Sequence, residues 1–184
     1  TSNQKFVKLW VDGSFRGCYV HYEPVEEGKD RVNIDIESND GKKDFMLELE
    51  QVNEEDDKTY LTIDNKRIRF AFSEPEEPNE EQVAYVQGIM DDTLATIKTG
   101  VKEDIEQKID IDSFVKYFLL NEYLKTHDFD RTSVYFYYKN GKLYAGPVWD
   151  YDLCTGNENP EFNVARSSRS APSDGVFANV NLYK

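Results

Sequence analysis

Hydrophobic and polar positions alternate through the first part of the chain in the manner of paired β-strands. The strands that this pattern predicts are residues 6–11, 15–23, 31–37, 44–50, 58–63 and 67–72. The segments between paired strands, Asp12-Gly13, Asn39-Asp40-Gly41 and Asp64-Asn65-Lys66, contain the residue types that tight hairpin turns require. The alternation is clearest at Val32, Ile34 and Ile36, and it predicts antiparallel sheets with one face toward water.

The pattern changes to helical spacing after a polar break at residues 73–78. Asn79 is a suitable N-cap for a helix that Gly100 would end. A second helix is predicted to begin at the cap residue Asp112 and to run to about Lys125. Its sequence is too apolar for a surface helix, so we expect it to be buried on most sides.

A further hairpin is predicted around Asn140-Gly141, with strands at residues 133–139 and 142–149. Two acidic pairs flank it, Asp128 with Asp130 before the first strand and Asp150 with Asp152 after the second. Because a hairpin brings its open ends side by side, we expect the two pairs to lie close together. Like charges in proximity repel one another, so a bound cation or a proton-transfer role would account for the arrangement. Beyond Gly156 the composition predicts a loop.

Composition narrows the possible functions. The chain of 184 residues is long enough for one domain with a core, and its twelve Tyr and eleven Phe argue against disorder. A net charge of −14 without a basic stripe argues against nucleic-acid binding and suits a basic protein substrate, or simply solubility. No apolar run approaches the roughly 20 residues of a membrane span. Cys18 and Cys154 lack zinc-ligand spacing, and two buried thiols are favoured over a disulfide.

Two short segments carry candidate chemistry, HDFDRTS at 127–133 and WDYD at 149–152. Phosphoryl transfer requires one carboxylate near the acceptor hydroxyl and another on the Mg²⁺ that bridges the phosphates. Protein-kinase catalytic loops place an Asn five residues after the catalytic Asp, and Ser133 occupies that position after Asp128 as a weaker metal ligand. Two other interpretations stay open: the carboxylates are caps and turn residues, or they hold a structural Ca²⁺. Glu23 would either cap a turn, which is favoured, or face a nucleotide.

Four segments, in this order, resemble blocks of the CotH kinase family, the relatives of spore coat protein H. They are VKLWVDGSFRGCYVHYEPVEE, FMLELEQ, IDIDSFVKYFLLNEYLK and KNGKLYAGPVWDYDLCTGN. The last is the most specific, because it contains the Gly-Pro-x-Trp-Asp-x-Asp signature. The resemblance covers nearly all of the chain. It implies an α+β, atypical protein-kinase-like fold, the cofactors ATP and Mg²⁺, and phosphorylation of protein serines.

The resemblance also implies roles for individual residues. Asp128 would be the catalytic aspartate, with Asp130 as its rival, and Asp150 would bind the metal with help from Asp152. Ser133 stands where many members carry Asn, and Glu23 would support the nucleotide pocket. We expect a single domain over residues 1–184, incomplete at both ends, and a monomer acting on a basic, serine-rich protein. The setting would be extracellular or the spore surface of a bacterium. The alternative is a non-catalytic surface or scaffold module with a degenerate site.

Overall fold

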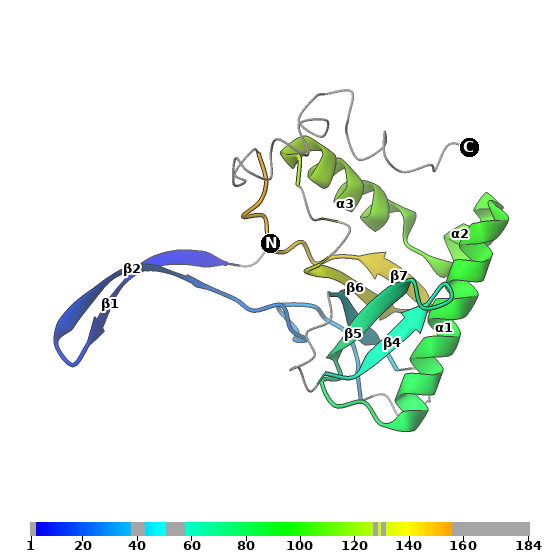
Figure 1. Cartoon of the computed structure of the whole chain (residues 1–184), viewed down its shortest axis with the longest axis horizontal. Helices are drawn as coiled ribbons and strands as arrows, with labels where there is room; N and C mark the ends of the chain where they lie inside the picture. The colour runs from blue at the N-terminus through cyan, green and yellow to red at the C-terminus, as the bar shows by residue number, and fades with distance from the viewer. Residues whose placement is uncertain (1–2, 38–42, 51–57, 127–128, 130–131, 156–184) are drawn as a thin grey trace.

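A computed structural model describes residues 3–37, 43–50, 58–126, 129 and 132–155 (Figure 1). Its strands are β1 (Gln4–Val11), β2 (Ser14–Tyr22), β3 (Phe45–Leu49), β4 (Tyr60–Ile63), β5 (Ile68–Glu74), β6 (Val134–Lys139) and β7 (Lys142–Ala145). Its helices are α1 (Glu80–Thr99), α2 (Lys102–Lys108) and α3 (Ile111–Leu124). Antiparallel sheets with helices confirm the predicted α+β class, and the arrangement is consistent with a kinase-like fold.

The central element is a five-stranded antiparallel sheet in the order β4-β5-β3-β6-β7. One face carries Phe45, Leu47 and Phe70, and α1 covers it through Val86 and Met90. The other face carries Met46 and Tyr135. These two residues pack with Trp149 and with apolar residues of the segment 25–36, among them Ile34. The second face is therefore covered around Met46 and Tyr135, whereas Arg69 of β5 is exposed, so the expected water-facing side holds for only part of the sheet.

The predicted strand at 31–37 does not form. Asp35 accepts a backbone hydrogen bond from Asp44 at 3.0 Å, and Ile34 N–H donates to Val32 at 2.9 Å, but no ladder is built here. Ile34 is nonetheless only 5 % exposed. The alternation of apolar residues in this segment therefore reflects packing on the second face of the sheet and not strand pairing.

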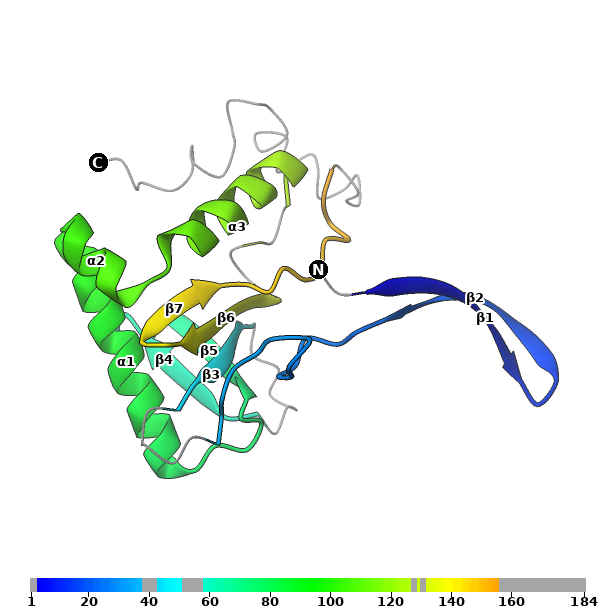
Figure 2. The same cartoon turned by 180° about the vertical axis from the view of Figure 1, so that it is seen from behind.

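The β1–β2 hairpin is an arm that projects away from the sheet (Figures 1 and 2). It forms at the predicted Asp12-Gly13 turn, with an irregularity between Leu9 and Trp10. Many of its apolar side chains face water, and Phe6 is 82 % exposed. Cys18 is exposed on the arm, so the expectation that both cysteines are buried is wrong for this one.

Helix α1 begins and ends where the sequence predicts. The Asn79 side chain accepts from Gln82 N–H, and the Gln82 side chain accepts from Asn79 N–H, both at 2.9 Å. This reciprocal capping box satisfies two backbone donors at the helix start. At the other end, Gly100 adopts φ 69°, a left-handed conformation that suits glycine.

Helix α3 differs from its prediction in two ways. Its cap is Asp110, whose carboxylate accepts from Ser113 N–H at 2.8 Å, instead of Asp112. Among its side chains only Asn121 is fully buried, whereas Leu119 and Tyr123 are 57 % and 82 % exposed. The helix packs against β7 at the edge of the sheet, so one side of it is covered. In the described part of the chain, no helix is long and apolar enough to cross a membrane.

Candidate active site

The scaffold of the candidate site is the β6–β7 hairpin. Its register pairs Tyr137 with Tyr144, and their rings stack at a centroid distance of 4.8 Å. Asn140 and Gly141 both have positive φ, 53° and 80°, as the predicted type I′ turn requires. The second strand ends at Ala145 and does not reach Trp149, because the following Gly-Pro has a proline without an N–H to donate.

The segments on either side of this hairpin return to the same helix. The Tyr117 hydroxyl of α3 donates to the carbonyl of Phe129 at 3.4 Å, before the hairpin. After the hairpin, Thr155 N–H donates to the carbonyl of Leu124 at 2.7 Å. These two bonds bring Phe129, before the hairpin, and Thr155, after it, to helix α3. Asp128 lies outside the described residues, as do His127, Asp130 and Arg131, so its catalytic role stays a prediction.

Ser133 and Asp150 share an uncommon backbone conformation, with φ 56° and 57°. Non-glycine residues with positive φ are infrequent, and they gather at functional sites when the surroundings hold them in place. Ser133 is half-buried at the start of β6, whereas Asp150 and Asp152 are exposed beyond the end of β7. Exposed carboxylates in a fixed turn are accessible to an incoming ion. Their assignment as metal ligands stays a prediction.

Trp149 holds the turn against the body of the protein. Its side chain packs with the buried residues Ile34, Met46 and Tyr135 on the second face of the sheet. Its ring centroid also lies 5.3 Å from that of Tyr22, at the end of β2. The residue next to Asp150 is therefore fixed by contacts to four different parts of the chain.

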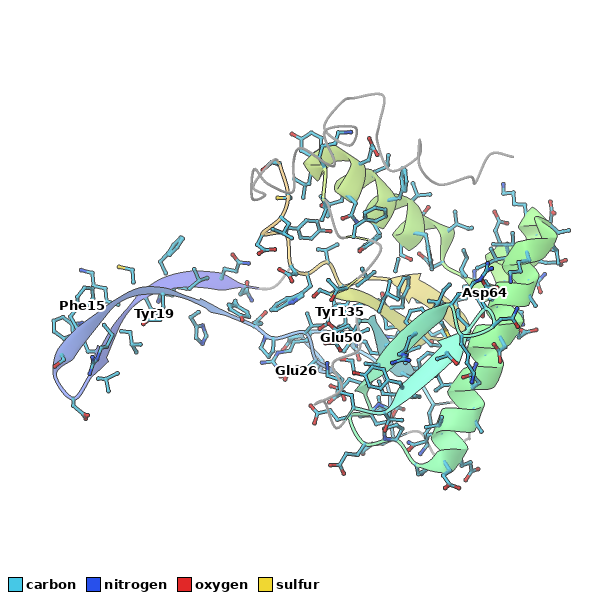
Figure 3. All side chains as sticks on the ribbon, in the orientation of Figure 1. Phe15, Tyr19, Glu26, Glu50, Asp64 and Tyr135 are labelled. Atoms are coloured by element: carbon cyan, nitrogen blue, oxygen red, sulfur yellow. The ribbon has the colours of Figure 1, made fainter. Side chains whose placement is uncertain are left out.

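The neighbourhood of Asp150 is acidic. Burial first, and then the charge of Glu48, raise the pKa of Tyr135, and the charges of Glu50 and Asp150 act in the same direction. Burial first, and then the charge of Glu50, also raise the pKa of Glu48. Lys58 offsets part of this charge, with its Nζ 2.5 Å from Glu50 Oε2 and 3.7 Å from Glu48 Oε2. Figure 3 shows Glu50 and Tyr135 in this region of the sheet.

Sequence reasoning did not identify the Glu48–Tyr135 pair. In FMLELEQ the alternation assigns Glu48 to a polar face, and a glutamate on such a face is ordinarily solvated. The Tyr-rich strand of the hairpin was the one signal in the sequence. It was not sufficient, because the sequence does not show which strand lies beside it in the sheet. The pair forms only when β3 and β6 lie side by side.

Glu23 has a structural role at the base of the arm. Its carboxylate accepts from Asn3 N–H at 3.1 Å and from Asn3 Nδ2 at 3.2 Å, which ties the chain before β1 to the end of β2. The backbone bond from Asn3 is the main reason that the pKa of Glu23 is lowered. Glu23 also lines a small cavity of about 130 Å³ together with Arg31 and Trp149. These contacts join the two ends of the arm and do not cap a turn, so the turn-capping interpretation and a role in a nucleotide pocket both stay predictions.

The carboxylates of Asp150 and Asp152 are of the chemical type that Mg²⁺ binds. Over the described residues, no group of three His, Cys, Asp or Glu side chains is arranged to hold a metal ion. Mg²⁺ commonly takes one or two carboxylates, and waters and substrate phosphates complete its octahedron. Asp150 and Asp152 offer such hard oxygen ligands on an exposed turn.

The fold and this turn define a class, that of α+β proteins of kinase-like organisation with acidic residues at the end of a β-hairpin. The family described as CotH kinase protein matches residues 1–182 of the 184-residue chain. The chain belongs to the CotH kinase family, as the sequence blocks predicted. No curated protein and no solved structure matches it.

Proposed function

We propose that this protein transfers the γ-phosphoryl group of ATP to serine hydroxyls of a basic protein. Membership of the CotH kinase family supports a kinase-type activity. The observation that carries the proposal further is the Asp150 turn, with its positive φ, its acidic surroundings and its position after the β6–β7 hairpin. The association of the family with the spore coat is the basis for proposing a spore-surface or extracellular setting in a bacterium.

Each residue has a defined task in this proposal. Asp150, helped by Asp152 and Ser133, would hold Mg²⁺ against the phosphates of ATP, and the ion would neutralise charge in the transition state. Asp128 would orient the substrate serine and accept its proton. Glu23 would support the nucleotide side of the site. Because phosphoryl transfer needs little covalent chemistry from the protein, positioning and electrostatics would provide most of the rate enhancement.

The acidic surface favours a basic substrate. The net charge of −14 attracts cationic peptides at long range and raises their local concentration. This attraction weakens with ionic strength, since the Debye length falls to about 8 Å at physiological salt. An arginine- and serine-rich peptide is therefore the natural test substrate, assayed at low and at physiological salt.

The test is phosphorylation of such a peptide by the full chain and its Asp150→Asn variant, measured as a mass shift with Mg-ATP. Asn keeps the left-handed conformation accessible and removes the charge. We expect activity to fall by about a hundredfold or more, the scale of losing one electrostatic stabiliser. Asp104→Asn, an exposed residue of α2, is the matched control and should keep full activity.

Two results would contradict the proposal. Full activity of Asp150→Asn would remove Asp150 from the metal site. Absence of both phosphorylation and calorimetric Mg-ATP binding in the unaltered chain would favour the alternative of a non-catalytic scaffold module. Thermal stabilisation by Ca²⁺ without nucleotide would instead indicate a structural ion.

A further inference from the structure

A pocket of about 500 Å³ lies between α3, the β6–β7 hairpin and the segment 31–33. Its volume is within the range of about 300–1,000 Å³ that is usual for ligand sites. Leu120, Pro147 and Val148 give it an apolar wall. Of the residues assigned to catalysis or to metal binding, none that the structure describes lines it.

The charge of this pocket is opposite to that of the protein. Three basic side chains, Arg31, Lys116 and Lys139, line it, and no carboxylate among the described residues does, in a chain with 36 acidic and 22 basic residues. Arg31 forms an ion pair with the Glu26 carboxylate, so the two lysines carry the excess charge. No described carboxylate forms an ion pair with either lysine.

Lys139 is positioned at the pocket wall. Its ammonium donates to the carbonyl of Asn33, a contact that joins β6 to the segment 31–33. An ammonium has three protons to donate, so two remain for a ligand. Lys116 is exposed on α3 and lines the same pocket. Two lysines that line one cavity favour a ligand with a compact double negative charge, as in a phosphate monoester.

We propose that this pocket binds a phosphoserine of a peptide substrate, an inference that rests on the proposed kinase function. Val148 lines the pocket and is two residues from Asp150, so their Cα atoms are at most about 7 Å apart. An extended peptide advances about 3.3 Å per residue, and a serine at the Asp150 turn would place a residue two to four positions away in the pocket. A serine phosphorylated in one round then anchors the substrate for the next.

This site is compatible with a basic substrate. The acidic surface attracts the arginines of a serine-rich peptide, and the cationic pocket accepts a phosphate that the rest of the surface would repel. The apolar wall accommodates the neighbouring peptide atoms. Phosphorylation of one serine therefore raises affinity for the same peptide, although it lowers the peptide's positive charge.

The experiment measures fluorescence anisotropy of a labelled arginine–serine peptide with one phosphoserine, and of its unphosphorylated counterpart, without nucleotide or metal. We expect the phosphopeptide to bind about tenfold more tightly, the effect of one charge-assisted hydrogen bond. Lys116→Gln and Lys139→Gln should each remove most of this difference. Lys142→Gln is the matched control, because Lys142 pairs with Lys139 across the hairpin but does not line the pocket.

Lys139→Gln also removes the contact to Asn33, so the exposed Lys116 provides the variant that leaves the fold intact. Equal affinity for the two peptides would overturn the proposal. An equal loss in Lys142→Gln would do so as well, because it would indicate general surface charge. Displacement of the phosphopeptide by ATP alone would show that the pocket is a nucleotide site instead.

Activity separates this inference from the proposed function. With Mg-ATP, the phosphorylated peptide should show a KM about tenfold lower than that of the unphosphorylated peptide, with kcat unchanged. Phosphopeptide binding without any phosphate transfer would support phosphoserine binding in the pocket and contradict the proposed kinase function. Phosphate transfer with equal KM for both peptides would support the proposed kinase function and contradict phosphoserine binding in the pocket.

Discussion

Glu48 and Tyr135 lie directly opposite each other on β3 and β6, and the Tyr135 hydroxyl donates to the Glu48 carboxylate. Burial raises the pKa of both side chains, so each is harder to ionise than it would be in water. The pair lies on the second face of the sheet, where the charge of Asp150 also acts on Tyr135.

Glu48→Gln should stabilise the protein at neutral pH. The pKa of Glu48 is raised above its ordinary 4.5 in the folded state, so the folded form holds the proton more tightly than the unfolded form. The contribution of protonated Glu48 to the free energy of unfolding is therefore fully present below pH 4.5. It is lost as the pH rises through the pKa of the folded state. Gln keeps an acceptor for Tyr135 without the charge.

We expect the Tm of this variant to exceed that of the parent by about 2–4 °C at pH 7.5, the shift for roughly 1 kcal/mol. At pH 4 the two proteins should unfold at similar temperatures. Glu106→Gln, on the exposed side of α2, is the control and should change little at either pH. A Tm difference that does not depend on pH would show that ionisation of Glu48 is not its cause.

The two tryptophans should differ sharply when truncated. Trp149 packs with buried residues and with Tyr22, so Trp149→Ala should lower the free energy of unfolding by about 2–3 kcal/mol. Trp10 is 60 % exposed on the arm, and its truncation should cost less than about 1 kcal/mol. Urea unfolding followed by far-UV circular dichroism measures both. Equal losses would mean that Trp149 does not anchor the turn.

Local chemistry made several elements predictable. Asn140-Gly141 predicted the hairpin because both residues accept positive φ, and the structure confirms it. The two ends of α1 have equally local causes. The Asn79 side chain caps the first turn, and Gly100 adopts the left-handed conformation that ends the helix. In each case the signal and the structure it specifies are separated by only a few residues.

Features that depend on distant neighbours were not predictable. The pairing of Glu48 with Tyr135 requires the sheet order, which alternation within one strand does not contain. Ile34 alternates with polar residues although its segment forms no strand, because the second face of the sheet covers it. The exposure of Tyr123 likewise depends on where α3 packs and not on the composition of the helix.

Two glycines associated with α1 should respond in opposite directions to alanine. A Cβ at Gly88 would meet no atom within 4 Å, so Gly88→Ala should stabilise the protein by about 0.5–1 kcal/mol through helix propensity. Gly100 has φ 69°, where a Cβ is strained, and Gly100→Ala should cost about 1–2 kcal/mol. Urea unfolding of both variants is the measurement. A loss of stability at Gly88 would contradict the open surroundings of that position.

Ser133→Asn should strengthen metal binding without harming the fold. Ser133 has φ 56°, and asparagine adopts this conformation more readily than serine, so stability should be unchanged or slightly higher. An amide oxygen is also a common ligand for hard divalent cations. If Ser133 contacts the ion, its Asn variant should reach half-maximal phosphorylation at a lower Mg²⁺ concentration, and Ser133→Ala at a higher one. Magnesium titration of the three proteins at fixed ATP decides the matter, since an identical requirement in all three would place Ser133 outside the metal site and leave its strained backbone as a feature of the turn into β6.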